Sequence, residues 1–490
     1  MQWVATTVDA WSCRNRSFLG MTCHWINPVT LKREQATLAC RRLRGSLTKD
    51  KLTATMEDVH RQFGIAGKIA RTTMDNGSNF VGAFSNFGSK KKSLQEPAQD
   101  MGDEAEQYFP LADLLGKEQK DYTLPKHMRC AAHCLHLVAT TDAAAAEKDD
   151  TFKAAQHAAT AKAGKLWAAA AQKADSIEDE VGNRLIVVPS GRGSWKSTYD
   201  AVVALLKVLE DKELRQAIPG LCSKLGVENF EPEDILFLQE YAWVMKHAVA
   251  EPLAQLQQEE NAYLGYLLPT IAVSWYNMEE ELKKKRLTYC EPMLAAVLAG
   301  SKKRFQQVFI EVDCWLAAAF HPCFRLHWLH LVDNSADRYT WIRRFMELAL
   351  AEHLKRNSEE ESGLDSGRGS GTKEEEEECE VDYFFQTTTT FKVGSAAATR
   401  AHNSATMVQD WLAGANTKKL DLKAFMSERA LMALFLEYNT PVPCSAAVAE
   451  VFSQGKDILR DKRSPLTDVN FEELVVLRGN EKLWPELTDD

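Results

Sequence analysis

The sequence predicts an α/β core joined to a large all-helical region. In the N-terminal part, four stretches are rich in alternating or β-branched apolar residues and predict strands, while one stretch has helical spacing. The strand predictions cover residues 2–9, 17–26, 33–43 and 68–75, and the helix prediction covers 53–63. From 197 to 355, apolar residues recur at the spacing of amphipathic helices. Strands, a helix and a further strand, followed by helices alone, are typical of an α/β domain with a helical addition.

Composition excludes several classes of protein. The 490 residues are 45% hydrophobic and 26% charged, which is the mixture of an ordinary globular chain. The net charge of −10 excludes a surface that is positively charged all over, so any DNA contact needs a local basic patch. Lys283–Arg286 is one such patch, and it could also serve as a nuclear import signal. Eleven irregularly spaced cysteines suit a reducing compartment. No apolar run reaches the ~18 residues that a membrane helix needs.

Changes in composition divide the chain into five parts. Ser, Gly and Glu dominate one stretch, which includes an unbroken glutamate run at 374–378, and a segment with nothing to bury is expected to be a disordered linker. The predicted parts are the first part of the core (1–142), a helical insertion (143–356), the acidic linker (357–380), a helical connection (381–432) and a C-terminal segment that completes the core (433–484).

Asp9 and Asp75 are the first candidates for chemistry. Each is expected at the end of a strand and is followed by a polar turn. Carboxylates on neighbouring strand ends can share a divalent cation, and Mg²⁺ prefers such oxygen ligands in phosphoryl transfer. The alternative interpretation is two surface aspartates that begin turns.

Five motifs occur in an order that resembles the hAT family of transposases, and most closely its vertebrate transposase-derived members of the zinc finger BED type. They are Thr-Val-Asp-Ala-Trp-Ser (7–12), Thr-Met-Asp-Asn-Gly-Ser-Asn-Phe-Val (73–81), Cys-Ala-Ala-His-Cys-Leu-His-Leu (130–137), Trp-Lys-Ser-Thr-Tyr (195–199) and the C-terminal segment from Leu434 to Val475. The resemblance implies a ribonuclease-H-like core interrupted by the helical insertion and followed by a helical C-terminal dimerisation segment.

The resemblance also implies site residues. Members of the family would excise and join DNA with two Mg²⁺ ions held by an Asp, Asp and Glu triad. Asp9 and Asp75 would be the first and second metal ligands. Cys130, His133 and Trp195 fall on the motifs that support the site.

The third acidic position departs from the family pattern. The family typically has Ser-Ala-Ala-Val-Glu-Arg-Leu-Phe-Ser, whereas this chain has Ser-Ala-Ala-Val-Ala-Glu-Val-Phe-Ser at 445–453, which puts Ala449 in place of the glutamate. Glu450 is the next residue, about 100° further round a helix, and would serve only if the register differs. Ser194 also stands where the family has an arginine beside Trp195. A methyl group cannot bind Mg²⁺, so these departures predict an inactive enzyme.

The cluster of Cys130, His133, Cys134 and His136 could be interpreted as a zinc site. Structural zinc usually takes two separated pairs of ligands, whereas these residues crowd into one predicted helix. We therefore interpret the segment as an apolar helix on which Cys130 and His133 make local hydrogen bonds. The Cys-x₂-Cys…His pattern of a BED zinc finger does not occur, and the strand at the very start predicts that an upstream portion is missing.

The C-terminal segment carries three apolar helical stripes. About fifty residues are too few to bury three stripes on their own, so they must pack on the core, on a second copy, or on both. The resemblance favours a homodimer. The residues assigned to dimerisation are Leu434, Phe435, Tyr438, Val448, Val451, Phe452, Phe471, Leu474 and Val475.

The sequence therefore predicts a transposon-derived nuclear pseudoenzyme that acts through homodimerisation and weak DNA binding. It would need no membrane, no small-molecule substrate and no cofactor. One alternative is an active hAT transposase, in which Asp9, Asp75 and a displaced Glu450 bind Mg²⁺ for DNA cleavage and strand transfer. Another is a cytosolic interaction scaffold or an inert relic of a mobile element.

Overall fold

The computed structural model describes most of the chain. The described residues are 2–13, 15–46, 48–75, 80, 83–84, 123–172, 194–258, 262–333, 335–365, 396–420, 425, 428–459 and 466–483. Within this part, no helix combines the length and apolar character required to cross a bilayer.

A five-stranded mixed sheet forms the core, in the order β3-β2-β1-β4-β5. The strands are β1 (Val4–Cys13), β2 (Arg16–Ile26), β3 (Arg33–Leu43), β4 (Ile69–Met74) and β5 (His127–Arg129). The first three are antiparallel, while β4 pairs parallel with both β1 and β5. The predicted fold class is confirmed: a mixed sheet in a ribonuclease-H-like domain is followed by a largely helical region. The strand β5 was not predicted, because three residues are too short for a periodic signal.

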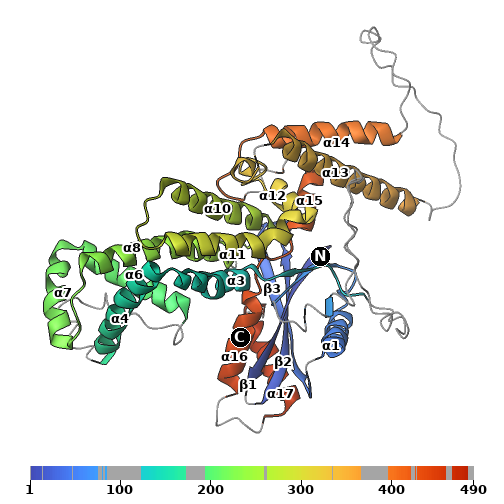
Figure 1. The fold of residues 1–490 in the computed structure, drawn as a ribbon. Coiled ribbons are helices and arrows are strands. Elements are labelled where there is room, and N and C mark those ends of the chain that lie inside the picture. The colour runs from blue at the N-terminus through green and yellow to red at the C-terminus, as the bar shows by residue number, and fades with distance from the viewer. Residues whose placement is uncertain are drawn as a thin grey trace, which may run out of the picture.

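Helices cover both faces of this sheet (Figure 1). On one face, Leu52, Met56 and Val59 of α1 (Lys49–Gln62) pack against apolar residues of β1, β2 and β4. On the other face lie α16 (Ala446–Ile458) and α17 (Asp468–Gly479), from the far end of the chain. Gly20 of β2 permits this close approach, since a methyl group there would meet Phe452 and Val448 at 2.7 Å.

The remaining described segments are almost entirely helical. In chain order they are α3 (Ala131–Leu137), a π-helix (Val138–Asp142), a 3-10 helix (Ala143–Lys148), α4 (Asp150–Gln172), α6 (Trp195–Glu210), α7 (Lys212–Leu225), α8 (Pro232–Met245), a π-helix (Lys246–Ala250), α9 (Glu251–Leu256), a 3-10 turn (Leu264–Tyr266), α10 (Leu267–Lys284), α11 (Glu291–Ile310), α12 (Val312–Ala319), a 3-10 turn (Leu329–Leu331), α13 (Ala336–Asp365), α14 (Ala396–Ala413), α15 (Arg429–Asn439) and a last 3-10 turn (Glu481–Leu483).

Two predicted boundaries differ from the structure. The strand predicted at 2–9 continues to Cys13, because β2 pairs with β1 along its whole remaining length. The linker predicted from 357 starts too early, since α13 runs to Asp365. Glutamates at 359–361 are good helix formers and extend a helix already anchored by packing. The other residues of the predicted linker lie outside the described part.

Candidate active site

Asp9 and Asp75 occupy equivalent places on neighbouring strands. The parallel register of β1 and β4 pairs Val8 with Met74, so Asp9 and Asp75 are the next residues on each strand. Asp9 does not end its strand as predicted, but it lies just past the last residue that pairs with β4. Side chains alternate along a strand, so Asp9 points to the face opposite Val8. That face is the one that α16 covers.

The pKa of Asp9 is strongly raised in the folded protein. Burial, followed by the nearby charge of Asp75, raises the pKa of Asp9 from 3.8 to about 7. Two interactions oppose this rise in pKa: the backbone N–H of Ala10 donates to Oδ1 of Asp9 at 2.7 Å, and the charge of His133 lies nearby. Asp9 therefore keeps its proton to a higher pH than an ordinary aspartate does.

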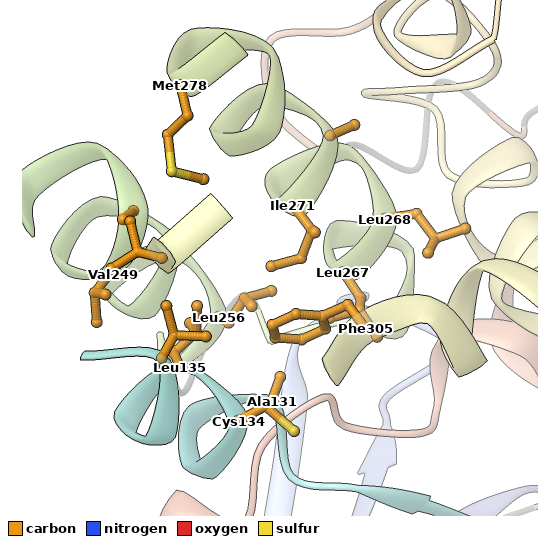
Figure 2. Close-up of a cluster of buried hydrophobic side chains, with 14 of the residues drawn as sticks. Ala131, Cys134, Leu135, Val249, Leu256, Leu267, Leu268, Ile271, Met278 and Phe305 are labelled. Atoms are coloured by element: carbon orange, nitrogen blue, oxygen red, sulfur yellow. The ribbon is translucent and has the colours of Figure 1, made fainter. Parts of the chain in front are cut away.

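His133 binds Asp75 directly. Its Nδ1 lies 2.7 Å from Oδ1 of Asp75, and this hydrogen bond raises the pKa of His133 despite partial burial. The helix α3 positions the imidazole because its opposite side is buried in the helical region. Figure 2 shows Ala131, Cys134 and Leu135 of α3 facing apolar side chains of α9, α10 and α11. The resemblance had marked His133 as a motif residue, but its partner across the sheet was not predicted.

Cys130 connects three segments that are distant in sequence. It caps the start of α3, and its backbone N–H donates to the carbonyl oxygen of Met74 at 2.8 Å. Its Sγ accepts a hydrogen bond from the backbone N–H of Ser445 at 3.3 Å. The backbone N–H of Ala131 donates to the carbonyl oxygen of Pro443 at 2.9 Å. These contacts bring the segment before α16 to the carboxylates.

The third acidic position lies on α16. Val448 and Phe452 face the sheet at Gly20, which pairs with Asp9. Ala449 follows at about 100° and lies on the flank of this buried face, whereas Glu450 lies at about 200° and points away. Both side chains are exposed. Oε1 of Glu450 accepts a hydrogen bond from Nε2 of Gln454 at 3.5 Å, one turn along the exposed side of the helix.

The fold implies Mg²⁺ at this place, but the residues do not fit a two-metal site. Of the acidic triad that the resemblance implies, two carboxylates are present, those of Asp9 and Asp75. Across the described residues, no three His, Cys, Asp or Glu side chains are arranged to hold one metal ion. The candidate ligand Glu450 faces solvent, and Ala449 offers only a methyl group.

Trp195 belongs to the helical region. It is buried at the first turn of α6 and packs within the large helical core. Ser194 caps this helix, since its Oγ accepts a hydrogen bond from the backbone N–H of Ser197 at 3.2 Å. Serine is among the preferred residues at an N-cap, which gives Ser194 a local structural role where the family has arginine.

The nine residues assigned to dimerisation lie mostly inside the chain. Leu434 and Phe435 are buried in the helical core, where Tyr438 is half-buried, whereas the stripes of α16 and α17 pack on the sheet. Leu474 is 38% exposed, and it is the exception among the nine. The contact of these helices with a second copy therefore stays a prediction, and it would have to use the exposed side of α17.

Two residues of β4 that bind distant segments, Arg71 and Thr73, were not predicted. They alternate with Asp75, which follows the strand, and each of the three binds a distant segment. Nη1 of Arg71 lies 2.5 Å from Oε2 of Glu311, and its Nη2 lies 2.9 Å from Oδ2 of Asp313. Oγ1 of Thr73 donates to the carbonyl oxygen of Val442 at 2.5 Å. An arginine within a strand expected to be buried was the available signal, because buried charges are usually paired.

This combination of mixed sheet and in-register aspartates is that of a ribonuclease-H-like domain. Residues 7–99 match the family model of the ZBED1 RNase-like domain, and this match includes both Asp9 and Asp75. No curated protein is found to match the chain.

Proposed function

We propose that this chain is a transposase-derived pseudoenzyme, which no longer cuts DNA and which acts in the nucleus by self-association with weak DNA contact. The observation that carries this proposal is the exposed methyl group of Ala449 on the flank of α16, beside the helix face that packs near Asp9. Two-metal phosphoryl transfer depends on carboxylates that hold both ions in place. Loss of one ligand costs orders of magnitude in rate.

The electrostatics of the remaining carboxyl groups support the same proposal. Burial and the nearby charge of Asp75 raise the pKa of Asp9, so in the absence of a metal ion Asp9 binds a proton more readily than a free aspartate. Asp75 already binds His133 through one of its oxygens. A charged carboxylate at position 449 would be needed to bring a cation to this pair.

A cleavage assay on the full chain tests the proposal. With hairpin and transposon-end DNA in Mg²⁺ or Mn²⁺, the native protein is expected to release no cut strand. Ala449→Glu is expected to raise cleavage about 10- to 100-fold above that background, because it restores a third oxygen ligand on α16.

Two variants make this assay specific. Ala449→Gln adds a side chain of the same length without the charge and is expected to stay inactive. Asp75→Asn combined with Ala449→Glu is expected to lose whatever Ala449→Glu gained. Cleavage by the native chain that disappears on Asp75→Asn would instead establish an active transposase.

Exposed apolar residues of the C-terminal helix support self-association. Val469, Leu474 and Leu477 of α17 remain exposed after the opposite side of the helix has packed on β3. At high micromolar concentration we expect light scattering to give twice the monomer mass of 55.0 kDa. A substitution of Leu474 by Arg is expected to return the mass to that of one chain, whereas Val29→Arg, at an exposed turn far from α17 in sequence, serves as the control. A monomeric native chain at that concentration would contradict this part of the proposal.

The nuclear location rests on the basic run at the end of α10. Lys283 and Lys284 are exposed and pair with Glu280 and Glu281 one turn earlier, while Lys285 ends the helix with a φ of 48°. A fluorescent fusion of the full chain separates a nuclear protein from a cytosolic scaffold.

A further inference from the structure

Cys130 and Cys444 form a contact between two parts of the chain that the proposed function does not use. The Cys444 thiol hydrogen-bonds to the Cys130 sulfur, and the neighbouring N–H of Ser445 donates to the same sulfur at 3.3 Å. Both cysteines are buried, and both are free thiols. Hydrogen bonds from Cys130 N–H to Met74 and from Ala131 N–H to Pro443 hold the two backbones together on either side of the sulfurs.

We propose that Cys130 and Cys444 form a reversible intramolecular disulfide when the protein reacts with a hydroperoxide. The bond would join the start of α3 to the segment that leads into α16. It would therefore link the C-terminal helices covalently to the part of the core that carries Asp75.

The surroundings of Cys130 differ from those of the other buried cysteines. The hydrogen bond between the two sulfurs lowers the pKa of Cys130 and raises that of Cys444, whereas burial raises the pKa of Cys23 and of Cys40 to about 12. The thiolate is the form that reacts with peroxides, and thiols in apolar surroundings are inert. Within the described part of the chain, this contrast makes Cys130 the expected site of first attack.

The reaction balances with one molecule of hydrogen peroxide. The sulfur of Cys130 attacks one peroxide oxygen, the O–O bond breaks, and the products are a sulfenic acid on Cys130 and water. The sulfur of Cys444 then attacks the sulfenic sulfur, the S–S bond forms, and a second water leaves with the remaining thiol proton. The two thiols lose two electrons and the peroxide gains them. A dithiol reductant reverses the step.

Peptide mapping of the oxidised full-length chain tests the proposal. After hydrogen peroxide treatment, trypsin is expected to release peptide 130–148 linked to peptide 430–456, and dithiothreitol is expected to separate them. Since Cys130 and Cys134 share the first peptide, fragmentation between them must assign the link to Cys130. The closed loop spans more than 300 residues, so the oxidised chain is expected to melt about 5 °C higher than the reduced one.

Matched variants give the opposing outcomes. Cys130→Ser and Cys444→Ser are each expected to abolish the linked peptide, whereas Cys13→Ser, at the half-buried end of β1, is expected to leave it unchanged. The map of the native chain is decisive even if either serine variant fails to fold. A link from Cys134 to Cys444, or oxidation of Cys130 to a sulfinic acid with no link to Cys444, would overturn the proposal.

Discussion

Replacing Arg71 by Met is expected to lower the free energy of unfolding by about 3–5 kcal/mol. The Arg71 side chain is 4% exposed, and it lies between the carboxylates of Glu311 and Asp313. Methionine retains most of the length and the apolar volume but removes the positive charge. The carboxylates of Glu311 and Asp313 then remain close together and partly shielded from solvent, while Lys126 still pairs with Asp313. Urea denaturation followed by circular dichroism measures the loss.

Lys126→Met is the matched control, since its amino group also binds Asp313 but its side chain is 57% exposed. Removal of an exposed partner is expected to cost less than about 1 kcal/mol. Adding Glu311→Gln and Asp313→Asn to Arg71→Met is expected to recover part of the stability, because the stranded charges disappear. A loss below about 1 kcal/mol for Arg71→Met would show that the network contributes little to joining β4 to the helical region.

Asp9→Asn is expected to stabilise the protein at pH 8, by on the order of 3 kcal/mol. The folded state raises the pKa of Asp9 from 3.8 to about 7, so it holds a proton that the unfolded chain releases. The contribution of this group to stability is fully present below pH 3.8 and is lost as the pH rises to about 7. Asparagine has nearly the same shape and never ionises, so the variant avoids that loss.

Denaturation between pH 4 and pH 8 measures this effect, with EDTA present to exclude metal ions. The advantage of Asp9→Asn is expected to grow through this range and to vanish near its acidic end. Glu450→Gln removes a carboxylate from the exposed side of α16 and is expected to change stability by less than about 0.5 kcal/mol at every pH. A constant difference between Asp9→Asn and the native chain would mean that Asp9 ionises as an ordinary exposed aspartate.

Both variants act on the face of the sheet where the core, the helical region and the C-terminal segment meet. Arg71 holds the α11–α12 junction, Thr73 holds Val442, and Asp75 holds His133. Arg71 and Thr73 of β4, together with Asp75 just after it, thus contact three distant segments. The site is consequently built by docking, and its geometry depends on contacts between residues 58 to 369 positions apart in the chain.

The fold class could be predicted from local patterns. Alternation predicted β2 and β3 nearly to the residue, because one sheet face packs on α1 and the other on α16 and α17. Helical spacing predicted the region from 197 to 355, because each helix there likewise buries an apolar face. The strand β5 carried no such pattern, and the end of α13 was missed because its last turns continue a helix that packing has already begun.

The site could be predicted only in part. Motif order indicated Asp9 and Asp75, and the parallel register of β1 and β4 brings them side by side. The pairing of His133 with Asp75 was not predicted, because the sequence around a histidine on an apolar helix does not indicate which distant residue it contacts. The sequence showed that the C-terminal helices carry apolar stripes. It did not decide whether these stripes pack on the core or on a second copy. In the structure most of them cover the chain's own sheet and helices.

The sequence by itself determined the local features of the site: an aspartate on each of two strands, a methyl group at position 449, and three apolar helical stripes near the C-terminal end. These are local properties, because they depend on side-chain type and on spacing along one element. Only the tertiary structure decided that the pKa of Asp9 is raised, that Asp75 binds His133, and that Cys130 contacts Cys444. The physical reason is that burial and electrostatic interaction depend on which distant segments meet, and the spacing of residues along the chain does not encode that.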